Sequence, residues 1–322
     1  MTKPASDPTR QGPRASEAHA SRSLDDASDS LAKRRSLKED ERLAGKLKGQ
    51  RVRSKTERLL TRTTSGVIYA LCIIVCLYLG RFATALLVAM MSWLCCSEFY
   101  RIVRMGGRMP NEFMGLAAAV LYPVAALVGK ETANGVTLLL VLAVGTWYVL
   151  TPRANVSDAS VTVFGPIYTG LLFSSVVTIR MSDPGTQGAL LTLGVMGSVW
   201  INDALAYLVG SRLGRHRLAP RISPNKSWEG LFGGLVGSCG TWLAIMAIGV
   251  QGVTLPLAMV AGLLCGIAGV AGDLFESRLK RAVGVKDSGN LMPGHGGLLD
   301  RSDSMLFASM TAYFVLHLGG VL

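Results

Sequence analysis

The residues best suited to chemistry lie in a polar segment near the end of the chain, which reads GDLFESRLKRAVGVKDSGNLMPGHGGLLDRSDS from Gly272 to Ser304. If the preceding helix continues into this segment, one of its faces carries two carboxylates, a hydroxyl and an ammonium at helical spacing, on Asp273, Glu276, Ser277 and Lys280. Carboxylates bind Mg²⁺, and Lys or Arg neutralises phosphate oxygens. The segment therefore predicts a divalent-metal site for a polyphosphate.

A glycine-rich connection follows that face and is flexible enough to wrap backbone amides around an anion. Its small residues include Gly289, Gly294, Gly296 and Gly297. Positive side chains lie in and beside it, on Lys280, Arg281, Lys286 and His295. Three charged residues then precede the last apolar run, namely Asp300, Arg301 and Asp303. These three are interpreted either as part of the same site or as a helix N-cap with a membrane-flanking charge.

Two further groups of polar residues lie upstream. Asn202 and Asp203 fall inside an apolar run, where a central Asp costs about 2.5 to 3.5 kcal/mol to insert into a membrane. Such an acid predicts either a structural pairing between helices or a polar cavity. The next segment contains SPNKSWEG, from Ser223 to Gly230. Its hydroxyls and Lys226 are suited to binding phosphate oxygens.

The elements that must position these groups are membrane helices. The chain has 322 residues, of which 50% are hydrophobic and only 17% charged, whereas soluble domains carry roughly 25% charged residues. Much of the net charge of +12 belongs to a tail, because residues 1–64 hold 16 Lys and Arg against 9 Asp and Glu. Nucleic-acid binding is disfavoured because the rest of the chain is apolar. All six cysteines lie in apolar runs, which disfavours a zinc site or a disulfide framework.

After Thr64 the sequence contains nine apolar runs, which predict an all-α polytopic membrane protein with about nine transmembrane helices. The runs cover residues 65–80, 82–97, 113–129, 134–150, 161–179, 188–210, 230–250, 253–272 and 303–322. With the tail inside, the inner loops hold 14 Lys and Arg and the outer loops hold 3, as the positive-inside rule requires. We therefore expect a multi-pass protein of the cell (inner) membrane, with the N-terminus and the polar site cytoplasmic.

This pattern divides the chain into three regions. Residues 1–62 are expected to form a disordered basic cytoplasmic tail. A helix lying on anionic lipid over 36–62 is the alternative to a solvated chain there. Residues 63–185 are expected to form N-terminal membrane helices, and residues 186–322 a C-terminal catalytic membrane region.

The motifs resemble a known family. The stretch SRLKRAVGVKDSGNLMPGHGGLLDRSD, from Ser277 to Asp303, closely resembles the signature of phosphatidate cytidylyltransferases, the CDP-diacylglycerol synthases. The blocks EFYR, NDALAYLVG, ISPNKSWEG and GDLFESRLKR resemble the same family, in the right order. Met292 and Ser302 depart from the family's pattern, although both lie between the polar residues. The resemblance covers roughly residues 63–322.

The resemblance implies transfer of a cytidylyl group from CTP to phosphatidic acid, giving CDP-diacylglycerol and pyrophosphate for phospholipid biosynthesis. The implied cofactor is Mg²⁺, with a second cation such as K⁺ left open; the lipid bilayer is a further partner, and a homodimer is left open. The implied metal ligands are Asp273, Asp300, Glu276 and Asp303. Substrate binding is implied for Asp203, Ser223, Lys226, Ser277, Gly296 and Gly297. Catalytic roles are implied for Lys280, Arg281, Lys286, Asp287, His295 and Arg301.

Alternatives to this function stay open at this point. The same chemistry on another lipid phosphate is one, because nothing in the apolar runs identifies the acyl chains. A secondary transporter would also explain an intramembrane Asp203 and helices rich in glycine. It is disfavoured because most polar motifs lie in predicted cytoplasmic loops and no repeat symmetry is evident. A structural scaffold would leave the acidic and basic cluster unexplained.

Overall fold

The computed structural model describes residues 63–289, 291 and 296–322, and this part of the chain is mostly helical. The predictions for the tail, disordered or lipid-bound, lie outside the described residues. A first helix spans Thr63–Leu79. The helices that follow it are α2 (Arg81–Met105), α3 (Glu112–Val128), α4 (Lys130–Leu150), α5 (Val156–Pro166), α6 (Leu172–Arg180), α7 (Thr186–Leu213), α8 (Trp228–Ala247), α9 (Leu255–Ala282) and α10 (Leu299–Leu318). A π-helical turn, η1 (Ile167–Leu171), joins α5 to α6.

Six of these helical segments are long and apolar enough to cross a membrane. They are α2, Glu131–Leu150, Val156–Arg180, α7, α8 and α9. The first helix and α3 are shorter than the other candidates, and 17 residues extend only about 26 Å. Every predicted apolar run is helical, so the protein has the helices of a polytopic membrane protein, while the count of nine spans stays a prediction.

The first two predicted runs are separate helices that meet at Gly80. Its φ of +112° lies in the region that favours glycine. The chain therefore turns sharply between the first helix and α2. This agrees with the prediction of two segments in place of one irregular hairpin.

The loop predicted between α7 and α8 contains a small β-hairpin. Strand β1 (Arg217–Ala219) pairs antiparallel with β2 (Ser223–Ser227). The all-α prediction missed it because Ser, Pro and Asn have little preference for strands, and packing decides such cases. The hairpin leads directly into α8, where the Ser227 hydroxyl accepts a hydrogen bond from the Gly230 amide at 3.1 Å. Ser227 thereby caps the helix and fixes the direction in which β2 joins it.

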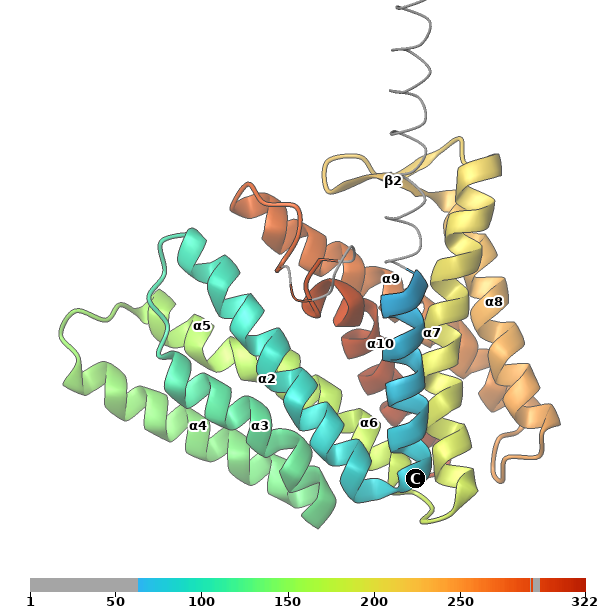
Figure 1. Cartoon of the computed structure of the whole chain (residues 1–322), viewed down its shortest axis with the longest axis horizontal. Helices are drawn as coiled ribbons and strands as arrows, with labels where there is room; N and C mark the ends of the chain where they lie inside the picture. The colour runs from blue at the N-terminus through green and yellow to red at the C-terminus, as the bar shows by residue number, and fades with distance from the viewer. Residues whose placement is uncertain (1–62, 290, 292–295) are drawn as a thin grey trace, which may run out of the picture. The chain divides into compact units, whose positions relative to one another are not determined.

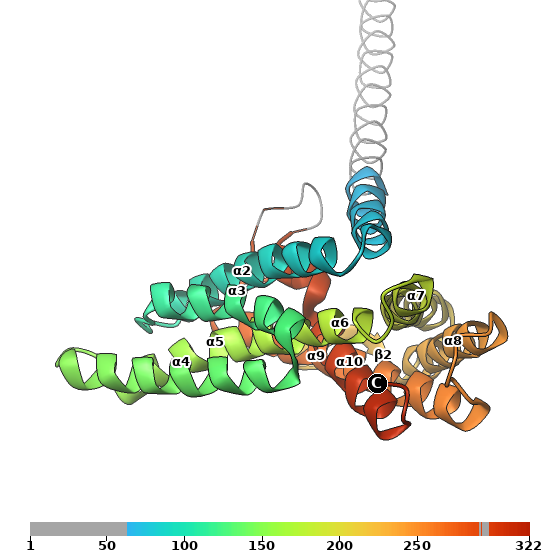
Figure 2. The ribbon, with the colours of Figure 1, turned by 90° about the horizontal axis from the view of Figure 1, so that it is seen from below.

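The helices form two connected regions, visible in Figure 1. On one side α2, α3 and α4 follow one another in contact, and Figure 2 shows the same succession from below. On the other side α7 packs on α8, and α9 packs against both α8 and α10. One hydrophobic core draws on α2, α6, α7, α9 and α10 and joins the regions. A smaller core lies between α3 and α4, around Tyr122 and Leu140.

Glycines permit the close approach of α8 and α9. A Cβ atom on Gly262 would lie 2.5 Å from the Cys239 Cα atom. On α8, a Cβ atom at Gly234 would lie 2.7 Å from the Asn202 side chain of α7. The helix glycines in this region therefore serve packing, as their spacing predicted.

Candidate functional site

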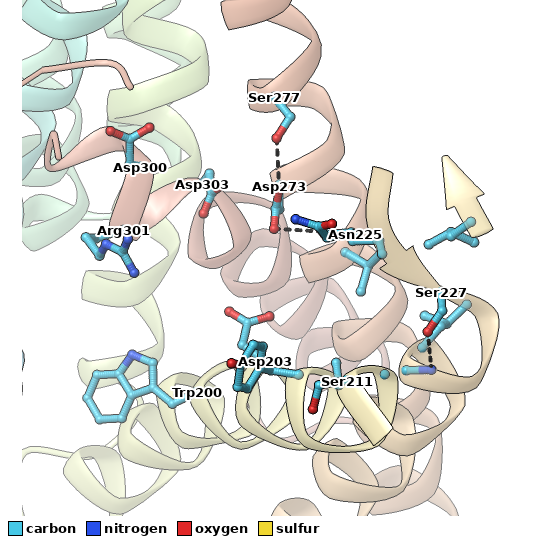
Figure 3. Close-up of a pocket in the computed structure, with 18 of the residues that line it drawn as sticks. Trp200, Asp203, Ser211, Asn225, Ser227, Asp273, Ser277, Asp300, Arg301 and Asp303 are labelled. Atoms are coloured by element: carbon cyan, nitrogen blue, oxygen red, sulfur yellow. Dashed lines mark hydrogen bonds and ion pairs between the residues drawn. The ribbon is translucent and has the colours of Figure 1, made fainter. Parts of the chain in front are cut away.

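A cavity of about 960 Å³ opens between the first helix, α7, the hairpin and the ends of α9 and α10. Figure 3 shows part of its lining. Most of the residues singled out from the sequence line it: Asp203, Lys226, Asp273, Ser277, Lys280, Arg281, Lys286, Asp287, Asp300, Arg301 and Asp303. Segments separated by up to 100 residues thus contribute charge to one cavity.

Three carboxylates reach this cavity from three different helices. Asp203 comes from α7, Asp273 from α9 and Asp303 from α10. The predicted continuation of the helix beyond residue 272 is confirmed, because α9 runs unbroken to Ala282. That continuation carries Asp273 and Ser277 to the cavity wall. The alternative of a polar cavity at Asp203 is therefore the one that the structure supports.

Asp273 is held from two directions. One of its oxygens, Oδ2, lies 2.7 Å from the Lys226 Nζ atom of strand β2. The other, Oδ1, accepts a hydrogen bond from the Ser277 hydroxyl at 3.1 Å, one turn further along α9. This ion pair attaches the hairpin to α9 across the cavity. It also places a Lys ammonium, a group suited to binding phosphate oxygens, beside a carboxylate at the cavity wall.

Lys280 lies between two acids. Its ammonium forms ion pairs with Glu276 and, at 2.5 Å, with Asp300 Oδ1. Glu276 is fully buried and Lys280 is only 7% exposed, so each buried charge has an opposite charge beside it. Glu276 shares the predicted helix face but does not line the cavity. Its carboxylate instead forms an ion pair with the Lys280 ammonium inside the protein.

Asp300 accepts hydrogen bonds on both oxygens. Besides Lys280 on Oδ1, its Oδ2 atom accepts from the backbone amides of Ser288 at 2.9 Å and Gly297 at 2.8 Å. Burial alone would raise the pKa of Asp300, but these bonds and the Lys280 charge together lower it below its ordinary value. The acid is therefore ionised and ties the connection after α9 to the start of α10.

The glycines of that connection bind the protein itself. The φ of Gly296 is +90°, and a Cβ atom there would lie 2.7 Å from Asp300 Oδ2. The Gly297 amide is already donated to Asp300. Neither glycine lines the cavity, and neither does Ser223, which begins β2. His295 lies outside the described residues, so its predicted role stays a prediction.

Sequence reasoning missed several cavity residues. An apolar and aromatic wall is formed by Tyr69, Ala70, Trp200, Tyr207, Leu231 and Val270. On the hairpin, Arg217 and Asn225 were not predicted. Of the two hydroxyls in the segment SPNKSWEG, that of Ser227 lines the cavity and that of Ser223 does not. The first helix also contributes side chains to the cavity, although it lies outside the region 186–322 that was predicted to be catalytic. No local pattern distinguishes the apolar and aromatic side chains of this cavity from ordinary membrane-helix residues.

Glu98 on α2 was recognised only as part of a family-like stretch. It is 8% exposed and accepts hydrogen bonds from Ser288, Leu298 and Leu299. The signal for it was present, because a carboxylate in an apolar run must find partners inside the protein.

The sequence of the chain also matches known proteins. The family model described as the cytidylyltransferase family matches residues 60–319. The chain belongs to the cytidylyltransferase family. The resemblance read from the polar motifs is thereby confirmed, and the matched region contains every described element of the cavity.

Individual relatives share this cytidylyltransferase sequence over different lengths. The chain is 30% identical over 268 residues to the phosphatidate cytidylyltransferase of Bacillus subtilis, covering 81% of this chain and 97% of that protein. It is 31% identical over 297 residues to that of Synechocystis, covering 83% and 98%. It is also 38% identical over 185 residues to the uncharacterized protein YnbB of Escherichia coli, covering 55% of this chain and 60% of YnbB.

The donor set of the cytidylyltransferase cavity suits a hard cation. Asp203, Asp273 and Asp303 offer only oxygen ligands, which Mg²⁺ prefers. Among the described residues no three His, Cys, Asp or Glu side chains form a group that could hold a metal ion by themselves. Mg²⁺ usually takes one or two carboxylates together with substrate phosphates. The residues present therefore fit an ion that arrives with a polyphosphate.

Proposed function

We propose that this cytidylyltransferase transfers the cytidylyl group of CTP to phosphatidic acid, forming CDP-diacylglycerol and pyrophosphate. The observation that carries the proposal is a cavity that Asp273, Lys226 and Arg301 line together with apolar and aromatic side chains such as Trp200. The phosphates of a nucleoside triphosphate would bind the charged side chains. A lipid phosphate would bind charged side chains with apolar surface beside them for its acyl chains. The near full-length match to two phosphatidate cytidylyltransferases supports the same pair of substrates.

The reaction needs no dedicated general base. A phosphate oxygen of phosphatidic acid is already anionic and forms the new bond to the α-phosphorus of CTP. The bond from that phosphorus to the oxygen bridging to the β-phosphate breaks, and pyrophosphate leaves with its electron pair. Catalysis then depends on holding the two phosphates in line and on neutralising their charge.

The cavity residues divide this work by charge. Arg281, Lys286 and Arg301 bring cationic groups to the wall, and we assign them to phosphate oxygens. Lys226 would bind a phosphate in place of its ion pair with Asp273. Lys280 carries its charge between Glu276 and Asp300, so its first role is to hold the two acids in place. Asp287 completes the rim of the cavity.

We assign a magnesium ion to Asp273 with Asp203 or Asp303. When bound, the ion would neutralise phosphate charge during transfer. Asp300 and Glu276, which the motifs also suggested as ligands, are already paired with Lys280. We therefore propose that Asp300 and Glu276 do not bind the metal directly but fix the position of Lys280 at the end of α9. We assign no residues to a second cation such as K⁺.

We infer that the cavity faces the cytoplasm of a bilayer crossed nine times, with the N-terminus on the same side. This orientation would place CTP in the aqueous phase and phosphatidic acid in the adjoining leaflet of the inner membrane. The excess of Lys and Arg in the inner loops supports it. Selective labelling of single cysteines placed at positions 109 and 184 from either side of sealed vesicles would test the orientation.

A single assay tests the activity. Purified protein would be incubated with phosphatidic acid, Mg²⁺ and CTP labelled at either the α- or the γ-phosphate. We expect the α-label to enter the lipid phase and the γ-label to leave as pyrophosphate. A lipid product with an ether-lipid or polyprenyl phosphate but none with phosphatidic acid would change the assigned acceptor. A folded protein that labels no lipid phosphate would overturn the proposal.

A further inference from the structure

Glu98 lies on α2 outside the cavity, yet its carboxylate binds both the connection after α9 and the start of α10. Its Oε1 atom accepts a hydrogen bond from the Leu298 amide at 3.0 Å. Its Oε2 atom accepts from the Leu299 amide at 2.8 Å and from the Ser288 hydroxyl at 2.7 Å. The partners follow Glu98 by 190 to 201 residues. One side chain thus joins the two distant parts of the chain.

The start of α10 needs such a partner. The first amides of a helix have no acceptor within the helix, and the residue at the cap position, Leu298, has no side chain that could supply one. The Glu98 carboxylate accepts from two of these amides and places a negative charge at the positive end of the helix. This cap comes from another helix, where the sequence had suggested Asp300 or Asp303.

Helix α2 gives Glu98 a fixed position. Its neighbours Cys95, Phe99 and Tyr100 are at most 2% exposed. The Tyr100 hydroxyl also donates a hydrogen bond to the Thr162 carbonyl at 2.7 Å. The carboxylate is therefore held by a packed helix and cannot follow the connection if that connection moves.

The same contacts reach Asp300. The Ser288 hydroxyl lies 2.7 Å from Glu98 Oε2 and 3.1 Å from Asp300 Oδ2, and its single proton can be donated to either acid. The backbone amides of Ser288 and Gly297 are donated to Asp300. Glu98 and Asp300 therefore share Ser288 and bind successive amides at the start of α10, and Asp300 in turn binds Lys280.

Two glycines allow the connection after α9 to approach the Glu98 carboxylate closely. A Cβ atom on Gly289 would lie 2.6 Å from Glu98 Oε1. A Cβ atom on Gly297 would collide with both the Glu98 carboxylate and the Ser288 hydroxyl. Backbone and carboxylate can approach this closely only where side chains are absent. The glycines of the connection thus serve the binding of Glu98.

From this geometry we infer that Glu98 is a positioning residue for cytidylyl transfer. Its carboxylate fixes the start of α10, so that Asp300 and Lys280 keep their places at the cavity wall, although Glu98 itself does not line the cavity. The inference rests on the proposed function, which supplies the reaction that this positioning serves.

The test compares Glu98→Gln with a matched control, Asp158→Asn. Asp158 is also a buried carboxylate that binds backbone amides at a helix start, but its partners are Met109 and Asn155, which do not line the cavity. Glu98 instead shares Ser288 with Asp300, which does line it. In Glu98→Gln the amide NH₂ would face N–H donors in place of an acceptor. We expect kcat/KM to fall about 10- to 100-fold, as for a small misplacement of a reacting group. We expect Asp158→Asn to keep the wild-type value per folded molecule.

A double-mutant cycle separates positioning from general stability. Because Glu98 acts through Asp300, Glu98→Gln should add little to the loss caused by Asp300→Asn. Glu98→Asp should recover part of the activity because it keeps the charge, and Ser288→Ala should lose less because the backbone bonds remain. If Glu98→Gln does not fold, these two variants carry the test. Equal losses in Glu98→Gln and Asp158→Asn, or full additivity with Asp300→Asn, would overturn the inference.

Amide hydrogen exchange provides a measurement that needs no activity. Exchange at Leu298 and Leu299 should rise in Glu98→Gln and stay unchanged in Asp158→Asn. If the wild-type protein made no lipid product, the proposed function would fail, while this measurement would still report whether Glu98 fixes α10. Unchanged exchange at both amides in Glu98→Gln would show that it does not.

Discussion

The carboxylate at the start of α5 is bound by nearby backbone amides, whereas the carboxylates of the cavity face a shared open space. At the start of α5, Asp158 is 2% exposed and accepts hydrogen bonds from the amides of Met109 at 2.8 Å and Asn155 at 3.2 Å. Its own amide donates to Asn155, which completes a capping box. Near the ends of α9 and α10, Asp203, Asp273 and Asp303 face a shared cavity. An acid satisfied by nearby backbone has completed its role, whereas acids gathered around a cavity remain available to a ligand.

The largest effect is expected where a buried charge loses its partner. Lys280→Met would leave Glu276 buried without its ammonium and remove one bond from Asp300. Breaking such a pair costs about 3–5 kcal/mol of folding free energy. Thermal or denaturant unfolding in detergent should show this loss, together with loss of product formation. A Glu276→Gln change in the Lys280→Met background should restore part of the stability, and its failure to do so would contradict the pairing.

Asp273 tests the ligand-facing region directly. Asp273→Asn keeps the shape of the side chain but removes the charge, so cytidylyl transfer should fall by roughly 100- to 1,000-fold. The variant should still fold, because Asp273 lies at the cavity wall. Turnover is measured with α-labelled CTP at several Mg²⁺ concentrations. Activity near the wild-type level at ordinary Mg²⁺ would remove Asp273 from the site.

Asp158→Asn should show the reverse pattern. Losing part of a helix cap costs about 0.5–2 kcal/mol of stability, while kcat per folded molecule should stay the same. Unfolding curves and the transfer assay on the same preparation measure both. A large fall in kcat without a change in stability would mean that the two regions are not functionally distinct.

The smallest effect is expected at an exposed ion pair of the same region. Arg104 and Glu112 lie 2.8 Å apart, with side chains 52% and 31% exposed. Such pairs contribute about 0.2–1 kcal/mol. Glu112→Gln should therefore leave both the unfolding midpoint and turnover close to wild type, with any difference disappearing at high salt.

Local pattern was sufficient for the helices and for part of the site. The spacing of Asp273, Ser277 and Lys280 placed them on one face of α9, and the structure brings all three to the cavity. The same spacing could not show that Glu276 is fully buried. A helical pattern indicates on which face of the helix a side chain lies, but not how far that face is covered by other helices. It could not show the partners of Glu98 either, since they lie about 200 residues away.

The hairpin was missed for a related reason, while the substrate-binding role predicted for the glycines stays a prediction. The polar strand containing Asn225 and Lys226 has no alternating apolar pattern, and its pairing depends on the surrounding fold. Gly296 and Gly297 were predicted to bind substrate because glycine-rich backbone can wrap around an anion. The anion that they surround is the protein's own Asp300. The glycine-rich pattern thus indicated contact with an anion, and the structure shows such a contact with Asp300.

The contacts of the Glu98 carboxylate also bear on whether the protein can be made as two separate pieces. The connection at 181–185 between α6 and α7 is a convenient place to cut it. The later piece would hold most cavity residues but would leave the amides of Leu298 and Leu299 without their acceptor, at about 1–3 kcal/mol each. The earlier piece would carry a carboxylate without its donors. The two pieces should therefore bind each other when they are co-expressed. Each piece made alone should lack hydrogen-bond partners that the other supplies.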